Sequence, residues 1–262
     1  RVLFRSDVVV VDDEPEAVEG APVPVVGPDA VDVEGCDAVI RSPGVPGSHP
    51  VLQRAHELGI PVWAEVELGY RLLPPGARLV GITGTNGKTT TTELVGAMLR
   101  EAGIPNAVCG NVGTALCEVA PHVPEGTVAV CELSSFQLED IHALRCDAAA
   151  LLNITPDHLD RHGSLEEYRR VKLRIFENQD ERDTAVLDDD AEACRELRRL
   201  PGDAEIVRVR GADADEVGFA ESRLRGDHNR ENVAVAAALA RAVGASDAAD
   251  RKSTRLNSSH VS

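Results

Sequence analysis

A glycine-rich segment between an apolar run and an amphipathic helix constrains this chain more than any other feature. Residues 77–82 predict a strand, and residues 89–102 predict a helix whose apolar side chains share one face. The segment between them contains Gly84, Thr85, Asn86, Gly87, Lys88, Thr89 and Thr90. Glycines let the backbone approach phosphate oxygens, and a helix N-terminus offers them unpaired N–H groups. We therefore predict a phosphate-binding loop, with Lys88 at the β/γ-phosphates and Thr89 at Mg²⁺.

This loop is shorter than the regular phosphate-binding motif. The pattern GxxxxGK[ST] would require glycine at position 82, where the chain has Ile82. The strand–loop–helix context supports phosphate binding despite the difference. An ordinary glycine-rich turn is the alternative.

Polar residues follow two further predicted strands, at 127–133 and 148–154. Glu132 stands at the end of the first, and His158 follows the second. Because the carboxyl ends of parallel strands meet at one edge of a sheet, both side chains are candidate metal ligands. Considered separately, a glutamate at a strand end or a histidine in a loop is more often an ordinary solvated residue.

Lys172 lies on the apolar stripe of a helix predicted at 164–176, four residues after Tyr168 and four before Phe176. Burial would lower the pKa of its amine, and a neutral amine reacts with carbon dioxide to form an anionic carbamate. The chain has only three lysines among its 27 basic residues, which favours a role that arginine cannot fill. The helical pattern alone nevertheless favours the alternative, in which the side chain reaches solvent along its stem.

Strands and helices alternate along most of the chain. Further strands are predicted at 8–11, 36–40, 60–63, 184–187 and 205–209, and further helices at 50–58 and 229–243. The run 8–11 reads as a buried strand. We expect an α/β fold with a mostly parallel sheet and helices on both faces. A partial Rossmann-like domain over 7–73 and a P-loop-type central domain over 76–246 would be joined at the Pro/Gly linker 73–76.

Charge and cysteine content exclude several classes of function. The net charge of −17 gives no electrostatic reason to bind nucleic acid, and no apolar run approaches the length of a membrane span. The six cysteines form no CxxC pair, so we expect free thiols in a reducing cytosol. Residues 251–262 lack acids and change composition abruptly, which indicates a non-native tail, with a native flexible tail as the alternative.

Several segments together resemble the Mur ligase family, and specifically its D-glutamate-adding member. The phosphate-loop segment is shared with the whole family and with folylpolyglutamate synthases, whereas Glu-Leu-Ser-Ser-Phe-Gln-Leu-Glu at 132–139 distinguishes the D-glutamate-adding member. The resemblance also includes the segments 110–113, 153–160, 168–178 and 228–232. It extends from Val8 to Gly244.

The resemblance implies roles for particular residues. The nucleotide would contact the phosphate loop, Asn229 and Asn232, with the two asparagines facing adenine. Two Mg²⁺ ions would be held by Thr89, Glu132, His158 and Lys172, the last as a carbamate. The UDP-muramyl substrate would contact Asn111, Ser42 and Gly44. Lys88, Glu132, His158 and Lys172 are the implied catalytic residues.

The implied reaction joins D-glutamate to UDP-N-acetylmuramoyl-L-alanine at the expense of ATP. It proceeds through an acyl phosphate, in the cytoplasm, as a step of peptidoglycan synthesis, and the enzyme would be a monomer. The family's C-terminal domain and the opening of its UDP-binding domain have no counterpart here, so we expect a segment that is inactive alone. Asp12, Asp13 and Glu14 stand where the family sometimes has a basic residue.

Three other interpretations remain open. The chain could belong to a sibling Mur ligase or a folylpolyglutamate synthase, or it could be a non-catalytic remnant that binds Mg-ATP. A generic P-loop phosphotransferase is disfavoured, because it leaves the segment 132–139 and Lys172 unexplained.

Overall fold

A computed structural model describes residues 7–217, 219 and 224–246 of the chain. The predicted tail at 251–262 lies outside these residues. The chain divides into two compact units, Arg1–Trp63 and Ala64–Ser262. This boundary precedes the predicted linker at 73–76, because helix α2 (Glu65–Leu72) packs against α4 (Leu116–Val119) of the second unit. Gly69 permits that packing, since a Cβ there would lie 2.6 Å from the Leu116 side chain.

The first unit is small and built from short elements. Strands β1 (Val10–Val11) and β2 (Val25–Val26) pair in parallel, and β3 (Val39–Arg41) pairs with β4 (Val62–Ala64). Three single-turn 3₁₀ helices connect them, at Pro15–Ala17, Pro28–Ala30 and Val33–Gly35. Helix α1 (Pro50–Leu58) matches its prediction and ends at Gly59, which takes the left-handed conformation with φ of 69°.

The prediction of a buried strand at 8–11 is wrong for its first half. Val8 is 53% exposed and Val9 is 38% exposed, and only Val10–Val11 form a strand. The core of this unit comes instead from residues farther along the chain, which bury their side chains together: Val33, Val51, Leu52, Ala55 and Val62. An apolar run of four residues was therefore not sufficient to specify burial.

The second unit contains a six-stranded sheet in the order β10-β9-β8-β5-β7-β6. All of its described pairings are parallel, as the alternation of strands and helices predicted. The strands are β5 (Arg78–Thr83), β6 (Asn106–Gly110), β7 (Val128–Glu132), β8 (Ala148–Leu151), β9 (Thr184–Asp188) and β10 (Glu205–Val209). Strand β6 was not predicted; it is an edge strand of five residues, of which only the last two are buried.

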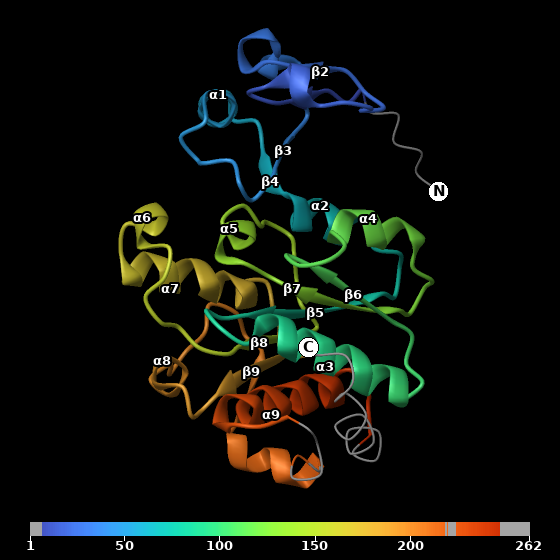
Figure 1. Ribbon diagram of the computed structural model, residues 1–262, viewed down its shortest axis with the longest axis vertical. Coiled ribbons are helices and arrows are strands. Elements are labelled where there is room, and N and C mark those ends of the chain that lie inside the picture. Colours follow the sequence, from blue (N-terminus) through green and yellow to red (C-terminus); the bar gives the residue numbers. More distant parts are fainter. Residues whose placement is uncertain (1–6, 218, 220–223, 247–262) are drawn as a thin grey trace. The chain divides into compact units, whose positions relative to one another are not determined.

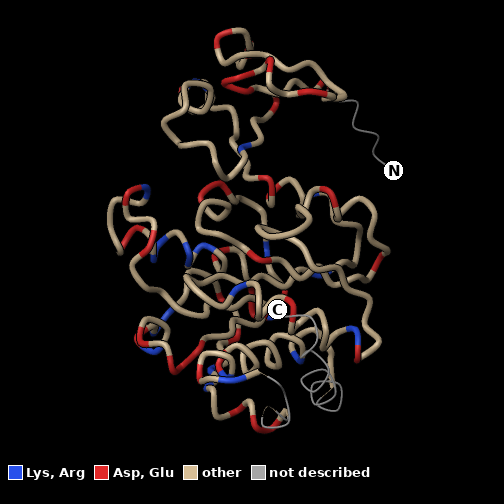
Figure 2. Tube along the Cα trace, in the orientation of Figure 1, with Lys and Arg blue, Asp and Glu red and all other residues tan. Residues whose placement is uncertain are grey.

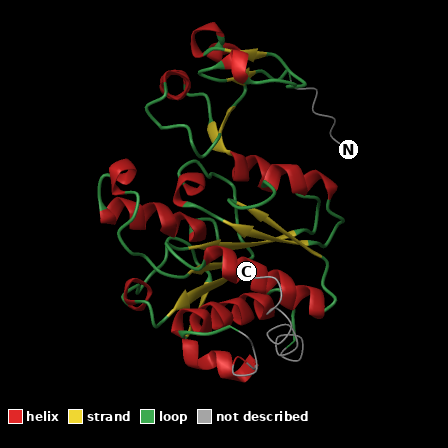
Figure 3. Cartoon of the chain, viewed as in Figure 1, coloured by secondary structure: helices red, strands yellow, loops and turns green. Residues whose placement is uncertain are grey.

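Helices cover both faces of this sheet (Figures 1 and 3). Helices α3 (Lys88–Glu101) and α9 (Asp227–Ala242) pack on one face, and α2, α4, α5 (Ser135–Leu138) and α7 (Leu165–Leu173) pack on the other. The remaining short helices are α6 (Leu159–His162) and α8 (Glu192–Arg195), with 3₁₀ turns at Ala120–His122, Arg174–Phe176 and Gly211–Val217. The helix predicted at 164–176 is thus α7 followed by a 3₁₀ turn.

The N-terminus of α7 shows half of the capping box for which the spacing of Ser164 and Glu167 is suited. The Ser164 hydroxyl accepts the Glu167 N–H at 3.1 Å. The Glu167 carboxylate, however, accepts from the Arg170 guanidinium at 2.6 Å and 2.8 Å. The reciprocal bond of a full capping box is therefore not formed, and an i,i+3 ion pair takes its place.

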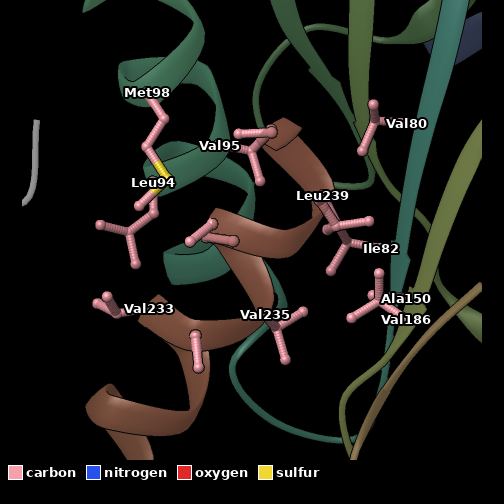
Figure 4. Packing of buried hydrophobic residues seen from close by; sticks show 14 of the residues in the cluster. Val80, Ile82, Leu94, Val95, Met98, Ala150, Val186, Val233, Val235 and Leu239 are labelled. Atoms are coloured by element: carbon pink, nitrogen blue, oxygen red, sulfur yellow. The ribbon is translucent and has the colours of Figure 1, made fainter. Parts of the chain in front are cut away.

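Alternating residues of β5 face the two apolar layers. Val80 and Ile82 pack toward α3 and α9, and Leu79 packs toward the opposite helices. Figure 4 shows the first layer, in which side chains of both helices meet those of the sheet: Leu94, Val95, Met98, Val233, Val235, Leu239, Ala150 and Val186. Each such buried side chain contributes roughly 1.5–3 kcal/mol of transfer free energy. This packing fixes α3, and with it the loop that precedes α3.

Acidic residues lie throughout both units and are more numerous than Lys and Arg (Figure 2), and the range 7–63 contains only two Lys or Arg residues, Arg41 and Arg54. Across the described ranges, no helix combines the length and apolar character needed to cross a bilayer.

The last residue of β9, Asp188, carries a cost of burial that its hydrogen bonds with the backbone of Asp190 and Ala191 compensate only in part. Asp188 is 2% exposed, and burial raises its pKa to about 6, with the negative charges of Glu231 and Asp190 adding to the effect of burial. The folded chain therefore binds this proton more tightly than the unfolded chain. Stability is consequently lost as the pH rises from the unfolded pKa toward 6.

Replacing Asp188 with asparagine should remove this pH-dependent loss. Its amide oxygen can still accept the Asp190 N–H, which Asp188 accepts at 3.0 Å. We expect the free energy of unfolding of Asp188→Asn, relative to wild type, to rise by on the order of 1–3 kcal/mol between pH 4 and pH 7.5. Urea unfolding at both pH values measures the change. A difference between the two proteins that does not vary with pH would contradict the prediction.

Candidate functional site

The predicted phosphate loop joins β5 to α3. Gly87 has φ of 86°, and a Cβ there would lie 2.4 Å from the Asn232 Oδ1 atom, so the position requires glycine. A Cβ at Gly84 would lie 2.9 Å from the Leu152 side chain. Because the loop backbone packs closely at these two glycines, α3 begins at the carboxyl edge of the sheet. Its first N–H groups lie there, which is an arrangement that fits a phosphate.

Lys88 begins α3, and its ammonium lies over the loop. Its Nζ donates to the carbonyl oxygens of Gly84 at 3.0 Å and Thr85 at 2.8 Å. Burial lowers the pKa of Lys88, while the carboxylates of Glu132 and Asp157 oppose the decrease. A positive group held this close to the loop is placed to neutralise bound phosphate oxygens.

Two of the predicted site residues, Thr89 and Asn111, come from separate segments and bind the carboxylate of a third, Glu132. Glu132, at the end of β7, is 3% exposed. Its Oε2 accepts from the Thr89 hydroxyl at 2.6 Å, and its Oε1 accepts from the Asn111 amide at 3.2 Å. The pairing of β7 with both β5 and β6 brings these segments together. Hydroxyl and carboxylate oxygens are ligands that Mg²⁺ prefers.

A pocket adjoins this carboxylate. Its volume is about 190 Å³, and its lining residues come from α3, β6, the loop after β6 and β7: Thr89, Thr92, Glu93, Cys109, Gly113 and Glu132. The predicted metal ligands Thr89 and Glu132 therefore face a cavity next to the phosphate loop.

The two asparagines of the segment 228–232 differ in their surroundings. Asn232 is buried, accepts from the Thr91 hydroxyl at 3.3 Å, and contacts the loop at Gly87. Asn229 is half-buried in the first turn of α9, where its amide donates to the Arg225 carbonyl at 2.8 Å. The structure thus places Asn232 at the phosphate loop. The adenine contacts expected of both residues stay predictions.

Lys172 turns into the protein. It is 1% exposed, and its Nζ donates to the Gly84 carbonyl at 2.8 Å, the same oxygen that accepts from Lys88. The expectation that its side chain reaches solvent is wrong, because this loop carbonyl provides a partner in the interior. Burial lowers the pKa of Lys172 to about 7, with the positive charge of Lys88 adding to the effect.

His158 occupies a turn with the left-handed φ of 48°, at the start of α6. Its ring lies 5.0 Å from that of Phe136, and its Nε2 lies 3.5 Å from the Asp157 carboxylate. In the part of the chain that the structure describes, no three His, Cys, Asp or Glu side chains lie close enough to hold one metal ion. A second Mg²⁺ at His158 and Lys172 therefore stays a prediction.

The segment 153–160 supplies residues to which the sequence assigned no role. Asn153 and the backbone of Asn86 exchange two hydrogen bonds, at 2.9 Å and 3.1 Å, which hold the phosphate loop. The negative charge of Asp157 opposes the decrease that burial causes in the pKa of both Lys88 and Lys172. Asn153 and Asp157 follow the carboxyl end of β8, the neighbour of β5, and this position could have indicated a role for them from the sequence.

Ser42 and Gly44 lie in an exposed turn of the first unit. The Val45 N–H donates to the Ser42 carbonyl at 3.0 Å and closes that turn. Their contact with a UDP-containing substrate stays a prediction.

The parallel sheet, the lysine-bearing loop before α3 and the carboxylate on the adjacent strand are those of a P-loop-type α/β domain. The sequence model described as the Mur ligase middle domain matches residues 82–213, half of the chain, and the chain belongs to the Mur ligase family.

Individual relatives extend this finding. The chain is 42% identical over 220 residues to a Koribacter versatilis protein named UDP-N-acetylmuramoylalanine--D-glutamate ligase, a match that covers 76% of this chain and 48% of that protein. It is 42% identical over 245 residues to the protein of the same name from Rubrobacter xylanophilus, covering 87% and 54%. The chain spans about half the length of the curated relatives it matches.

Solved structures agree on the fold. The crystal structure of UDP-N-acetylmuramate:L-alanyl-gamma-D-glutamyl-meso-diaminopimelate ligase from Neisseria meningitides matches with a TM-score of 0.61 at 15% identity, covering 88% of this chain and 83% of that chain. The fold class predicted from the sequence is confirmed.

Proposed function

We propose that this chain is the nucleotide-binding part of an ATP-dependent acid–D-amino-acid ligase that joins D-glutamate to UDP-N-acetylmuramoyl-L-alanine. One observation carries the proposal: Thr89 of the phosphate loop and Asn111 of the next loop both bind Glu132. Glu132, the proposed Mg²⁺ ligand, thus binds both a residue of the proposed phosphate site and a residue expected to contact the substrate. The names of the relatives that are about 40% identical supply the substrates.

The reaction has two steps. An oxygen of the alanyl carboxylate attacks the γ-phosphorus of ATP, ADP leaves, and an acyl phosphate forms. The D-glutamate amine then attacks the acyl carbon, inorganic phosphate leaves, and the nitrogen loses a proton to give the amide. The first step brings together two anions that repel each other, so its principal requirement is neutralisation of charge.

The residues of this chain would meet that requirement from several directions. Lys88 and the N-terminus of α3 would stabilise the β/γ-phosphates, and Thr89 with Glu132 would hold Mg²⁺, which neutralises the phosphate charge when bound. Asn111, held by Glu132, would orient the substrate. His158 and a carbamate on Lys172 would hold a second Mg²⁺.

Carbamate formation at Lys172 has a chemical basis in the structure. With a pKa of about 7, much of the amine is neutral in the cytoplasmic pH range. The neutral nitrogen attacks carbon dioxide and loses a proton, so that a cation becomes an anion. This change would also remove the repulsion between Lys172 and Lys88, which donate to the same carbonyl oxygen.

The remaining assignments follow the same proposal. Asn229 and Asn232 would face adenine, and Ser42 and Gly44 would contribute to the uridine-diphosphate pocket. The first domain, over 7–73, would bind UDP, and the second, over 76–246, would bind ATP. The enzyme would work in the cytoplasm as a monomer on small-molecule substrates.

A substrate panel tests the activity. The complete ligase, incubated with UDP-N-acetylmuramoyl-L-alanine, ATP and Mg²⁺, should release one ADP and one phosphate per D-glutamate consumed. L-lysine, meso-diaminopimelate and folate with glutamate should give no product. Preferential addition to folate, or of another amino acid, would overturn the assignment. Binding of Mg-ATP without any product would instead support a non-catalytic nucleotide-binding protein.

A further inference from the structure

A buried histidine next to the site has no role in the mechanism above. His162, the last residue of α6, is 8% exposed. Its Nε2 lies 3.0 Å from the hydroxyl oxygen of the buried Ser135, and its Nδ1 lies 3.7 Å from a carboxylate oxygen of Glu139. Three segments that are separate in the sequence, α5, α6 and α7, meet around this imidazole.

Two aromatic rings enclose the imidazole. The Phe136 ring stacks on it at a centroid distance of 5.5 Å and an interplanar angle of 13°, and the Tyr168 ring lies 5.1 Å away on a tilt of 46°. We call Phe136, His162 and Tyr168 the aromatic column. The Arg161 guanidinium lies 4.1 Å from the Phe136 centroid, and the Lys172 Nζ lies 4.7 Å from the Tyr168 centroid.

One hydrogen bond, to Ser135, and the nearby Glu139 carboxylate fix the orientation of the His162 ring. Burial lowers the pKa of the imidazole, and the Glu139 carboxylate opposes that decrease without reversing it. A neutral imidazole carries one N–H, and the carboxylate beside Nδ1 favours the proton there. Nε2 is then the acceptor, and the Ser135 hydroxyl donates to it. Ser135 is 3% exposed and its hydroxyl donates to a buried acceptor, so we assign it a structural role and not that of a nucleophile.

The column ends at the phosphate loop. The Tyr168 hydroxyl lies 3.4 Å from the Thr85 hydroxyl, which donates to the Thr155 carbonyl at 3.2 Å. One turn farther along α7, Lys172 donates to the carbonyl of Gly84. Helix α7 therefore contacts two consecutive residues of the loop, and His162 packs against the tyrosine that makes one of these contacts.

We propose that His162 is a positioning residue, whose ring joins the α5 turn to Tyr168 and thereby holds Lys172 and the start of the phosphate loop in place. This inference rests on the proposed ligase function. The contact between the His162 and Tyr168 rings transmits the effect, and the Ser135 hydrogen bond keeps the His162 ring in its plane. Phosphoryl transfer depends on placement of its reacting groups, so a loosened column lowers turnover more than nucleotide affinity.

Four variants of the complete ligase test this arrangement, assayed well below their melting temperatures. His162→Ala removes ring and hydrogen bond, and should lower kcat by roughly ten- to a hundredfold while the KM for ATP changes less than about threefold. His162→Phe keeps a ring but leaves the Ser135 hydroxyl buried without its acceptor. The double variant His162→Phe/Ser135→Ala removes that hydroxyl and should recover kcat to within about threefold of the Ser135→Ala variant.

Phe176→Leu is the matched control, because Phe176 is fully buried in the 3₁₀ turn after α7 and belongs to the core. It should lower the melting temperature with kcat unchanged. The inference is overturned if His162→Ala retains the kcat of wild type, if the double variant is as slow as His162→Ala, or if Phe176→Leu loses kcat in the same proportion to stability.

A second measurement does not depend on ligase activity. Amine acetylation of the complete ligase, followed by digestion and mass spectrometry, resolves the peptide that contains Lys172 from the peptide that contains Lys88. The buried Lys172 amine should react at least about tenfold faster in His162→Ala than in wild type or Phe176→Leu, because the column that covers it opens. Equal rates in His162→Ala and wild type would overturn the inference. A wild-type ligase that makes no product would refute the proposed function, and the acetylation rates would still decide the role of His162.

Discussion

Replacing Lys172 with methionine is expected to lower kcat of the complete ligase by at least on the order of a hundredfold. Methionine preserves most of the buried volume and keeps an apolar stem, so the aromatic column, which residue 172 contacts at Tyr168, should remain packed. The variant cannot form the proposed carbamate and would therefore lose the proposed anionic metal ligand beside the phosphate loop. It also loses the hydrogen bond to the Gly84 carbonyl. Steady-state ADP release measures the effect.

Two controls distinguish a requirement for the carbamate from a requirement for the positive charge of the lysine. Lys172→Arg keeps a positive group but does not react with carbon dioxide, and should be as slow as Lys172→Met. Removal of carbon dioxide and bicarbonate should slow the wild type and leave both variants unaffected. Near-normal turnover in Lys172→Arg would show that a cation is sufficient and would refute the carbamate.

Replacing Glu67 with alanine is expected to lower the free energy of unfolding by about 3–5 kcal/mol. Glu67 lies on α2 and is fully buried, yet its carboxylate accepts three consecutive backbone N–H groups, those of His142, Ala143 and Leu144, at 2.9 Å to 3.1 Å. The Arg71 guanidinium donates to it at 2.7 Å. Alanine removes the acceptor of the Leu144 N–H, which belongs to a buried residue, and loss of a buried acceptor costs more than the lost bond alone.

The same carboxylate predicts how stability depends on pH. Burial by itself would raise the pKa of Glu67, but the three backbone hydrogen bonds and Arg71 outweigh burial and lower it. The stabilisation is therefore present above the unfolded pKa and is lost as the pH falls through the folded pKa. We expect the difference in unfolding free energy between wild type and Glu67→Ala to be constant near neutral pH and to decrease in acid.

Urea unfolding across that pH range measures the Glu67 effect, and an exposed glutamate provides the control. Glu57 pairs with Arg54 at 3.1 Å, with 67% of its side chain exposed. Glu57→Ala should change the free energy of unfolding by less than about 1 kcal/mol. If Glu67→Ala cost no more than the control, the carboxylate would not be the anchor between α2 and the 142–144 segment.

Local spacing was sufficient to predict the phosphate loop, the parallel α/β architecture with every strand of the sheet except β6, and the position of Glu132. Each of these depends on interactions between residues close in the chain. Gly87, Lys88 and Thr89 act through one turn and the first residues of one helix, and a strand-end carboxylate reaches the site because parallel strands end at a common edge. The residues of one turn, helix or strand end are therefore sufficient to predict these features.

Contacts between distant residues decided the remainder. Lys172 turns inward because it meets the Gly84 carbonyl, 88 residues away in the chain, and helical periodicity alone favoured solvent. Helix α2 joins the second unit because Glu67 and Gly69 fit segments near residues 116 and 142. The aromatic column forms only where α5, α6 and α7 meet. Burial and hydrogen-bond partners of this kind are properties of the packed chain, because the groups that determine them become neighbours only on folding.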